Sequence, residues 1–354
     1  MSSLETTIRD ILPWDDAWRA KARERLDQLT MPHWALGRLM DLAVDLAGMT
    51  RSLEPPVARK AIVTMAADHG VVAEGVSKYP QEVTAQMVAN FVHGGAGINA
   101  LARLAGAEVV VVDMGVAGDL SALAESGKVV SKRIAPATAN IARGPAMTAE
   151  QAQDAIEAGI QIARELGQRV DLFGSGDMGI GNTTPSTAIA AVFTGRPVDE
   201  LTGRGTGIDD AQLDVKIKIV EQSLQINQPD ARNGIDVLAK LGGFEIGGIA
   251  GLILGAAALK KPVVIDGFIS TAAALIAQSL APQSTDYVVA AHRSAEPGHG
   301  AMQEALGKVP LLDLDLRLGE GTGAALAMNL VEAAVRVLTE VATFEEAHVA
   351  EANS

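Results

Sequence analysis

The chain has 354 residues, no cysteine and a formal net charge of −14. An excess of acidic residues disfavours binding to nucleic acid or to anionic membranes, because both need basic protein surface. The lack of cysteine excludes disulfides, thiolate metal ligands and cysteine nucleophiles. We therefore expect a cytoplasmic protein with no nucleic-acid or membrane partner.

The composition also indicates the fold class. Hydrophobic residues make up 48% of the chain but aromatic residues only 3%, so we expect a core of Ala, Val, Ile and Leu, as in parallel α/β proteins. The first 50 residues predict polar helices that carry all three tryptophans, Trp14, Trp18 and Trp34. Large rings gathered at one end of the chain suggest packing against another element or subunit.

From about residue 60, short apolar runs alternate with longer helical stretches, which is typical of βαβ units and a parallel sheet. The predicted strands are residues 61–67, 108–112, 170–173, 262–265 and 287–290. Asp68, Asp113 and Asp266 directly follow three of them. Because ligands of open parallel sheets bind beyond the carboxyl ends of the strands, we expect the functional site at that edge.

The most hydrophobic segment of the chain, residues 246–259, is uncharged over 14 residues. A helix that spans a membrane needs about 20 apolar residues. The segment therefore predicts a helix buried in the protein core.

Residues 174–185 form a glycine-rich segment between a predicted strand and a helix. Converging backbone N–H groups and a helix N-terminus suit a phosphate or carboxylate ligand. The segment also matches the dinucleotide pattern G-x-G-x-x-G, beginning at Gly174. That interpretation needs a strand ending in an acid about 20 residues later, and Asp199 and Glu200 follow no such strand. A small-anion loop, a dinucleotide loop and a structural turn all stay open.

A second glycine-rich segment, residues 203–210, leads into a predicted helix. At 100° per residue, Lys216 lies at the edge of the apolar stripe of this helix, whereas Lys218 points away. Lys216 can therefore reach inward to a phosphate. Alternatively, its aliphatic stem only covers the margin of the core.

Residues 291–299 collect polar groups after the last predicted strand. Ser294 and Arg293 offer a hydroxyl donor and a positive charge that suit a phosphate. His292 and His299 have no companion acids at ligand spacing, so we predict no metal site.

Residues 316–327 place one carboxylate, Glu320, between two glycines where a loop meets a long alanine-rich helix. Because glycines let a ligand approach the main chain closely, Glu320 is a candidate general base; a solvated glutamate is the alternative. Thr322 is expected to cap the helix. The helix is predicted over residues 324–341, with ion pairs between Arg336 and acids four residues away.

Nine motifs, in order along the chain, resemble those of nicotinate-nucleotide:dimethylbenzimidazole phosphoribosyltransferases, enzymes of cobalamin nucleotide-loop assembly. They are residues 67–71, 74–76, 176–185, 226–229, 234–238, 242–244, 266–268, 294–296 and 317–327. The similarity runs from about residue 20 to 340, so it is more specific than any single glycine-rich loop.

The resemblance implies a homodimeric α/β protein with a three-layer, Rossmann-like parallel sheet and a small helical domain formed by both chain ends. We accordingly expect N-terminal helices over residues 1–58, a large substrate-binding domain over 59–320 and a completing C-terminal helix over 321–354. The implied reaction is attack of a benzimidazole nitrogen on C1′ of nicotinate mononucleotide, which gives α-ribazole phosphate and nicotinate with inversion. The resemblance implies neither a cofactor nor a metal.

The resemblance also assigns roles to positions of this sequence. Glu320 matches the general base of the family. The matching phosphate and ribose contacts are Gly176, Asp177, Gly179, Lys216 and Ser294, and the implied base pocket comprises Ser77, Tyr79, Gln86, Met87 and Leu318.

Three departures from the family pattern affect the expected site. Asp177 stands where the family usually carries Glu, and is one methylene shorter. Residues 32–37 replace a Pro-Gly-Ser-Leu-Gly run and are expected to add a bulky ring near the entrance. Tyr79 and Met87 replace smaller or more polar residues, so the identity of the preferred base stays open.

Two rival functions also stay open. The glycine-rich segment at Gly174 suits an NAD(P)-dependent oxidoreductase. The same scaffold could also serve as a non-catalytic nucleotide-binding sensor.

Overall fold

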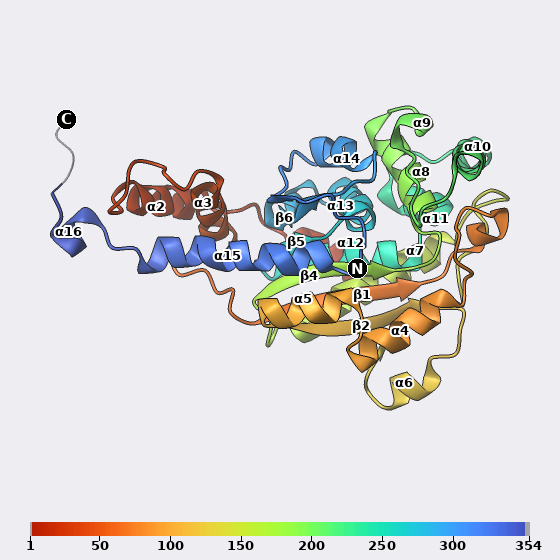
Figure 1. The fold of residues 1–354 in the computed structure, drawn as a ribbon, viewed down its shortest axis with the longest axis horizontal. Helices are drawn as coiled ribbons and strands as arrows, with labels where there is room; N and C mark the ends of the chain where they lie inside the picture. The colour runs from red at the N-terminus through yellow and green to blue at the C-terminus, as the bar shows by residue number, and fades with distance from the viewer. Residues whose placement is uncertain (1, 351–354) are drawn as a thin grey trace.

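The computed structural model describes residues 2–350. Six parallel strands form one sheet in the order β3-β2-β1-β4-β5-β6 (Figure 1). These strands are β1 (Lys60–Ala67), β2 (Ala107–Gly115), β3 (Val130–Ser131), β4 (Leu172–Met178), β5 (Val263–Ile265) and β6 (Val288–Ala290). A separate parallel pair joins β7 (His292–Arg293) to β8 (Leu312–Asp313).

Helices connect the strands and also form the segments before β1 and after β8. In the first half of the chain they are α1 (Ser3–Asp10), α2 (Asp16–Asp27), α3 (Arg38–Thr50), the 3₁₀ turn η1 (Gly70–Glu74), α4 (Val83–His93), α5 (Gly97–Ala105), α6 (Ser121–Glu125) and α7 (Ala149–Leu166). In the second half they are α8 (Thr183–Thr194), α9 (Val198–Leu201), α10 (Asp210–Asn227), α11 (Gly234–Leu241), α12 (Phe244–Ala258), α13 (Phe268–Leu280), the 3₁₀ turn η2 (Pro282–Tyr287), α14 (His299–Ala305), α15 (Thr322–Glu340) and α16 (Phe344–Ala347).

The parallel α/β class and all five predicted strands are confirmed. Strand β1 is buried along its whole length, as expected for a central strand covered on both faces. The predicted end of β4 is wrong, because the strand continues from residue 173 to Met178. Strands β3, β7 and β8 were not predicted, since two residues are too few to show a periodic pattern.

The strand order explains where a ligand can enter. The chain passes from β1 to β2 and β3 on one side of the sheet, and later adds β4, β5 and β6 on the other side. The direction of winding therefore reverses between β1 and β4. The connections that leave these two neighbouring strands diverge, and a crevice forms at their carboxyl ends.

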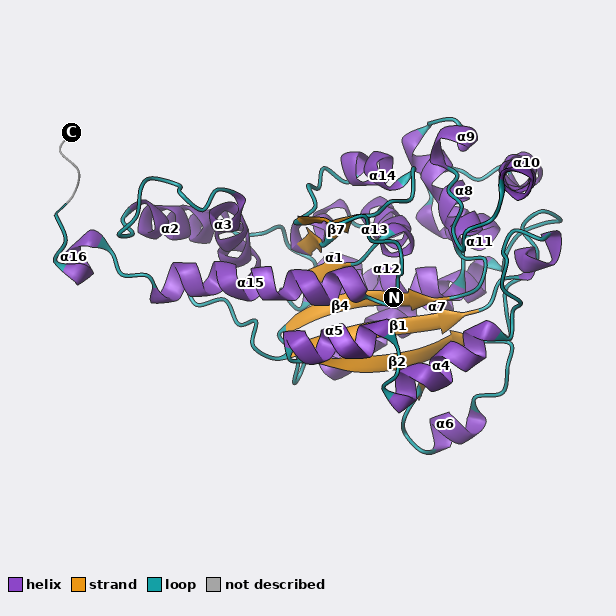
Figure 2. Ribbon diagram, in the orientation of Figure 1, coloured by secondary structure: helices purple, strands orange, loops and turns teal. Residues whose placement is uncertain are grey.

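Helices cover both faces of the sheet and complete three layers (Figure 2). Helices α4, α5 and α15 lie in front of the sheet in this view, and α7 and α12 lie behind it. Helix α12 is buried from Phe244 to Ala257, which confirms a buried helix over all but the last two residues of the predicted range 246–259. It packs closely on α7, because a Cβ at Gly251 would lie 1.9 Å from the carbonyl oxygen of Ile156.

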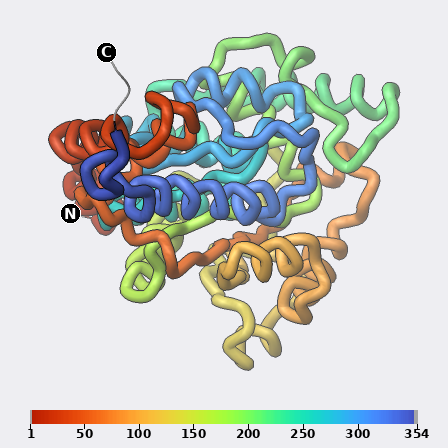
Figure 3. The backbone as a smooth tube through the Cα atoms, turned by 60° about the vertical axis from the view of Figure 1, so that its left-hand side comes forward, coloured from red at the N-terminus to blue at the C-terminus, as the bar shows by residue number. Residues whose placement is uncertain are grey.

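Segments from the two ends of the chain lie side by side, with α2 and α3 next to α15 (Figures 1 and 3). The guanidinium of Arg25 donates to the carbonyl of Leu338 at 2.8 Å, and the N–H of Thr30 donates to the carbonyl of Ala342 at 3.0 Å. Helix α1 is different, because it packs on α7 and α12 of the sheet domain. The domain boundaries at residues 58 and 320 stay predictions.

Helix α15 matches the helix predicted over residues 324–341 to within two residues at each end. The predicted ion pairs are confirmed, with Arg336 at 2.8 Å from Glu332 and 3.6 Å from Glu340. Within residues 2–350, α15 is the one helix long and apolar enough to cross a membrane. Half of its most apolar window is buried inside the protein, where it packs on α3, α5 and β4.

Candidate active site

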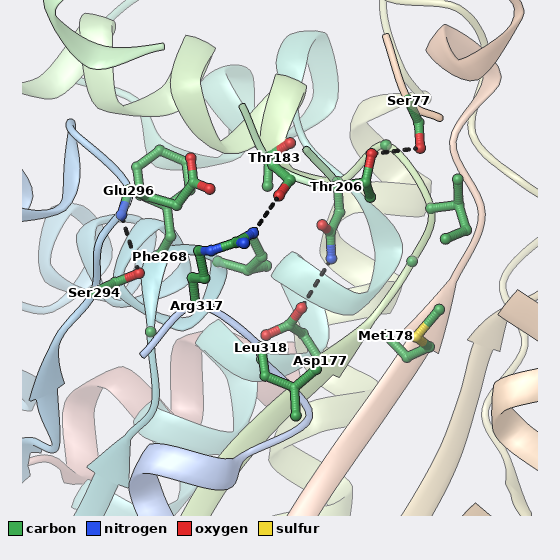
Figure 4. Close-up of a pocket in the computed structure, with 18 of the residues that line it drawn as sticks. Ser77, Asp177, Met178, Thr183, Thr206, Phe268, Ser294, Glu296, Arg317 and Leu318 are labelled. Atoms are coloured by element: carbon green, nitrogen blue, oxygen red, sulfur yellow. Dashed lines mark hydrogen bonds between the residues drawn. The ribbon is translucent and has the colours of Figure 1, made fainter. Parts of the chain in front are cut away.

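A cavity of about 390 Å³ opens at the carboxyl ends of β1, β4, β5 and β6 (Figure 4). This is the edge of the sheet at which the sequence predicts a site. The walls come from segments 76–79, 177–183, 205–206, 267–269, 292–296 and 317–319. Segments far apart in the sequence therefore converge on one space because parallel strands end at the same edge.

Asp177, near the end of β4, points into the cavity. Its carboxylate accepts a hydrogen bond of 2.9 Å from the side-chain amide of Asn182, at the start of α8. Burial raises the pKa of Asp177 to about 7; the Asn182 donor opposes this shift, and the negative charges of Glu245 and Glu320 add to it. Near neutral pH this carboxyl group is therefore present in both its protonated and its charged form.

The glycine content of segment 174–185 suggested one continuous loop, but the structure does not show one. Gly174 and Gly176 belong to β4, and the irregular part is confined to residues 179–182. A Cβ at Gly176 would lie 2.3 Å from the carbonyl oxygen of Glu320. Gly176 therefore permits close packing of two backbones and lies outside the cavity lining, whereas Gly179 lines the cavity.

Lys216 points inward from α10 and is fully buried, whereas Lys218 is exposed, as the helical spacing predicts. The ammonium of Lys216 donates to the hydroxyl of Thr183 at 2.8 Å and to the carbonyl of Gly203 at 3.0 Å. Burial lowers the pKa of Lys216 to about 8, and the Glu296 carboxylate opposes this shift. One of the three ammonium hydrogens is left for a ligand, directly behind the cavity wall formed by Thr183 and Gly205.

Ser294 lines the cavity on the same side and is held by a neutral histidine. Its backbone N–H donates to Nδ1 of His299 at 2.7 Å, so the Nε2–H of His299 donates to Thr271 at 2.8 Å. Burial lowers the pKa of His299 to about 3 and that of His292 to about 4. Both rings are therefore uncharged near neutral pH, and that of His299 positions Ser294 and Thr271. Among residues 2–350 no three His, Asp or Glu side chains gather as metal ligands.

Glu320 lies beside the cavity rather than in its lining. One of its carboxylate oxygens accepts the N–H of Ile98, in the first turn of α5, at 2.9 Å. Burial raises the pKa of Glu320, and the Ile98 donor opposes this shift. A Cβ at Gly97 would contact both Glu320 and Leu318, so the carboxylate lies next to a residue that does line the cavity.

The implied base pocket is brought together only in part. Ser77, Tyr79 and Leu318 line the cavity, and the Tyr79 and Leu318 residues are 54% and 62% exposed. Gln86 and Met87, on α4, are outside the lining. Trp34 is also outside it; its indole N–H donates to Asp41 near the start of α3, so the expected ring at the entrance is not present in this chain's cavity.

The N-terminus of α15 is not capped by Thr322, contrary to the prediction. Gly321 is the capping residue, and the hydroxyl of Thr322 donates backward to the carbonyl of Gly319 at 2.8 Å. The free N–H groups of the helix are bound by the carboxylate of Asp266, which follows β5. Local spacing could not reveal this cap, because Asp266 is 55 residues away from Gly321.

Some polar residues of the site were not predicted. Glu296 and Arg317 line the cavity, and Arg317 donates to the carbonyl of Gly205 at 3.4 Å across its mouth. Below the cavity, His69 and Glu245 form a buried pair at 2.8 Å. Burial lowers the pKa of His69, but the Glu245 carboxylate together with the charges of Asp68 and Asp177 outweighs this effect, so the net shift is upward. The position of His69 directly after a predicted strand suggested either a catalytic residue or one that holds a turn, but nothing in the sequence pointed to Glu245, 176 positions away, as its partner.

The interpretation of segment 174–185 as a dinucleotide-binding loop is wrong, because the acidic residues that it requires are not at the end of a strand. Asp199 and Glu200 lie in the short helix α9 and not at the end of a strand. The glycines of the pattern begin inside β4 instead of in a turn after it. The structure therefore lacks the local arrangement that places an acid on a ribose in dinucleotide-binding folds.

Comparisons with known proteins agree with this geometry. Residues 11–349 match the family model described as phosphoribosyltransferase. The chain is 65% identical to the nicotinate-nucleotide–dimethylbenzimidazole phosphoribosyltransferase of Syntrophotalea carbinolica, with 99% of each chain covered. It is 59% identical to the protein of the same name from Desulfotalea psychrophila, with 98% of each chain covered.

A solved structure agrees as well. The crystal structure of the phosphoribosyltransferase of this name from Thermus thermophilus superposes with a TM-score of 0.90 at 46% identity, covering 96% of this chain and 100% of that chain. The α/β fold that the motifs implied is thereby confirmed. The chain belongs to the nicotinate-nucleotide–dimethylbenzimidazole phosphoribosyltransferase family.

Proposed function

We propose that this chain transfers the 5-phosphoribosyl group of nicotinate mononucleotide to a benzimidazole-type base. The observation that carries the proposal is that the buried Glu320 carboxylate lies beside a cavity that Ser294 lines, with the Lys216 ammonium directly behind the wall at Thr183. A phosphate suits a buried ammonium and a hydroxyl. A flat apolar base suits the end next to Tyr79 and Leu318.

The proposed chemistry needs one proton acceptor. A nitrogen of the neutral base bonds to C1′ of the ribose, and the bond from C1′ to the pyridinium nitrogen breaks with its electron pair going to nicotinate. The attacking base then carries an excess proton on its other nitrogen. Glu320 accepts that proton, a role supported by burial that raises its pKa and makes it a stronger base.

The remaining work is to position two molecules. The pyridinium is already a good leaving group, so proximity and orientation supply much of the rate. Asp177 lines the cavity next to Gly319, where its carboxylate would accept hydrogen bonds from the ribose hydroxyls. Lys216, Gly179 and Ser294 would hold the phosphate. We further propose that the protein acts as a cytoplasmic homodimer.

The decisive experiment mixes the protein with nicotinate mononucleotide and 5,6-dimethylbenzimidazole and follows nicotinate and α-ribazole phosphate by chromatography. Release of both products in equal amounts is expected. A sensor on the same scaffold predicts a nucleotide-dependent rise in melting temperature without nicotinate release. Absence of turnover with any benzimidazole, purine or phenol would rule out the proposed activity.

A further inference from the structure

The backbone around Glu320 has an unusual conformation. Gly319, Glu320 and Gly321 have φ angles of 84°, 63° and 98°, so three consecutive residues lie in the left-handed region. Glycine adopts this region freely, whereas glutamate does so only at a cost in free energy. Such a conformation persists only where the surrounding structure imposes it.

Two contacts from the sheet fix the backbone of Glu320 itself. Its N–H donates to the carbonyl of Asp177 at 3.2 Å. Its carbonyl accepts the hydroxyl of Thr64, in β1, at 2.9 Å. These bonds tie Glu320 to the two strands that flank the crevice, β1 and β4.

On the helical side, the N–H and the hydroxyl of Thr322 both donate to the carbonyl of Gly319, and Asp266 supplies the remaining contacts. One carboxylate oxygen accepts the N–H of Gly321 at 3.0 Å, and the other accepts the N–H groups of Gly323 at 2.7 Å and Ala324 at 3.1 Å. Asp266 is 1% exposed, and its own N–H donates to the hydroxyl oxygen of Ser175 at 3.2 Å. The carboxylate thus binds three N–H groups of the segment that directly follows Glu320.

From this geometry we infer that Asp266 is a positioning residue for Glu320. By gathering the N–H groups that begin α15, its carboxylate imposes the left-handed turn that directs the Glu320 side chain to the N–H of Ile98. The inference rests on the proposed function, because it assigns Asp266 a role in orienting the proposed base. Asp266 itself lies outside the cavity lining, although Gly267 directly after it belongs to that lining.

Few titratable groups face Asp266 in this turn. Asp177 on β4 and His292 on β7 face Asp266, with Nδ1 of His292 at 3.7 Å from the carboxylate. Burial and the Asp177 charge raise the pKa of Asp266 to about 8, and the three N–H donors oppose the shift. Both protonation states keep oxygen lone pairs toward these donors, so the turn persists across neutral pH.

The test compares Asp266→Asn with the wild type. The amide nitrogen of asparagine cannot accept a hydrogen bond, so one side of the carboxylate's contacts is lost. We expect kcat for phosphoribosyl transfer to fall about 10- to 100-fold, with KM for nicotinate mononucleotide changed less than about threefold. The acid limb of the kcat profile should move to higher pH, because a Glu320 that leaves the Ile98 N–H has a higher pKa.

A matched control separates orientation from stability. Glu332 lies on α15, twelve residues after Glu320, and its carboxylate pairs with Lys60 of β1 and Arg336 of α15. Glu332→Gln removes the charge from these two ion pairs. It should lower the melting temperature and leave kcat and the acid limb unchanged. If Asp266→Asn lowers only the melting temperature, as this control does, Asp266 is a structural cap and the inference is wrong.

A second variant covers the case in which Asp266→Asn fails to fold. Ser175→Ala removes the hydroxyl that holds the backbone of Asp266 and should lower kcat by about three- to tenfold, with the same movement of the acid limb. An unchanged kcat and pH profile for a folded Ser175→Ala protein would overturn the inference. Failure of the proposed function would be seen separately, as a wild-type protein that releases no nicotinate.

Discussion

The two ends of the cavity are built differently. At the end proposed for the phosphate, Lys216 is buried and hydrogen bonded to two groups, and Ser294 is held by His299. At the end proposed for the base, Tyr79 and Leu318 are more than half exposed. Buried polar groups with satisfied hydrogen bonds fix a ligand's position, whereas exposed apolar side chains adapt to its shape. The phosphate end is therefore suited to one substrate, and the base end to several.

Glu320 is the exception to this contrast, because it is a tightly held carboxylate next to the adaptable end. Glu320→Gln should therefore lower kcat more than any other single change, by about 10²- to 10⁴-fold, with little change in KM. Steady-state rates of nicotinate release give both constants. Glu340→Gln, on the exposed side of the same helix, is the matched control and should retain full activity.

Lys216→Met tests the phosphate end. Loss of a charge-assisted hydrogen bond costs about 1.5–3 kcal/mol, which corresponds to a decrease of about 10- to 100-fold in kcat/KM for nicotinate mononucleotide. Lys218→Met on the exposed face of α10 serves as control. Equal activities of the two variants would remove Lys216 from the proposed phosphate site and would contradict the contrast drawn above.

Asp177 lines the cavity next to Gly319 and should show a pH effect on stability. Its folded pKa of about 7 lies above the unfolded value. The neutral carboxyl group therefore contributes stability that is present below about pH 4 and lost as the pH rises through about 7. Asp177→Asn stays neutral and should be more stable than the wild type at pH 8, by on the order of 2–4 kcal/mol. Denaturant unfolding at pH 8 and pH 4 measures this difference, which should vanish at pH 4.

The smallest effects are expected at the exposed end. Tyr79→Ala and Leu318→Ala should change the ratio of kcat/KM between two competing bases by up to about tenfold, because adding or losing apolar contact discriminates weakly. KM for nicotinate mononucleotide should stay constant. Competition between 5,6-dimethylbenzimidazole and unsubstituted benzimidazole provides the measurement. A large loss of nucleotide affinity would show that the two ends are not independent.

Features that depend on local periodicity could be predicted from the sequence. Five apolar runs located five strands, and a spacing of 100° per residue was enough to turn Lys216 inward and Lys218 outward. The position of Glu320 between two glycines also indicated a special turn, and its φ of 63° is in keeping with that.

Features that depend on contacts between distant segments could not be predicted. Gly176 looked like part of a loop, but it lies in β4. Glycine is needed there because the backbone of Glu320 passes too close for a side chain. Thr322 looked like a helix cap, but Asp266 occupies that role from the end of β5. The His69–Glu245 pair joins residues 176 positions apart. In each case the partner is selected by the folded sheet and not by neighbouring residues.

The contact between the chain ends has a consequence for synthesis. Leu29 forms an antiparallel bridge with Thr343, and Arg25 binds the carbonyl of Leu338. Helices α2 and α3 are made early by the ribosome, but the helix on which they pack begins only at Thr322. Domains generally fold during synthesis from the N-terminal side. Helices α2 and α3 are an exception, because they cannot complete their packing until α15 has been made. Glu320 directly precedes α15, and Thr64 of β1 and Asp177 of β4 hold its backbone. A growing chain therefore acquires its proposed base only after the strands that hold its turn have been made.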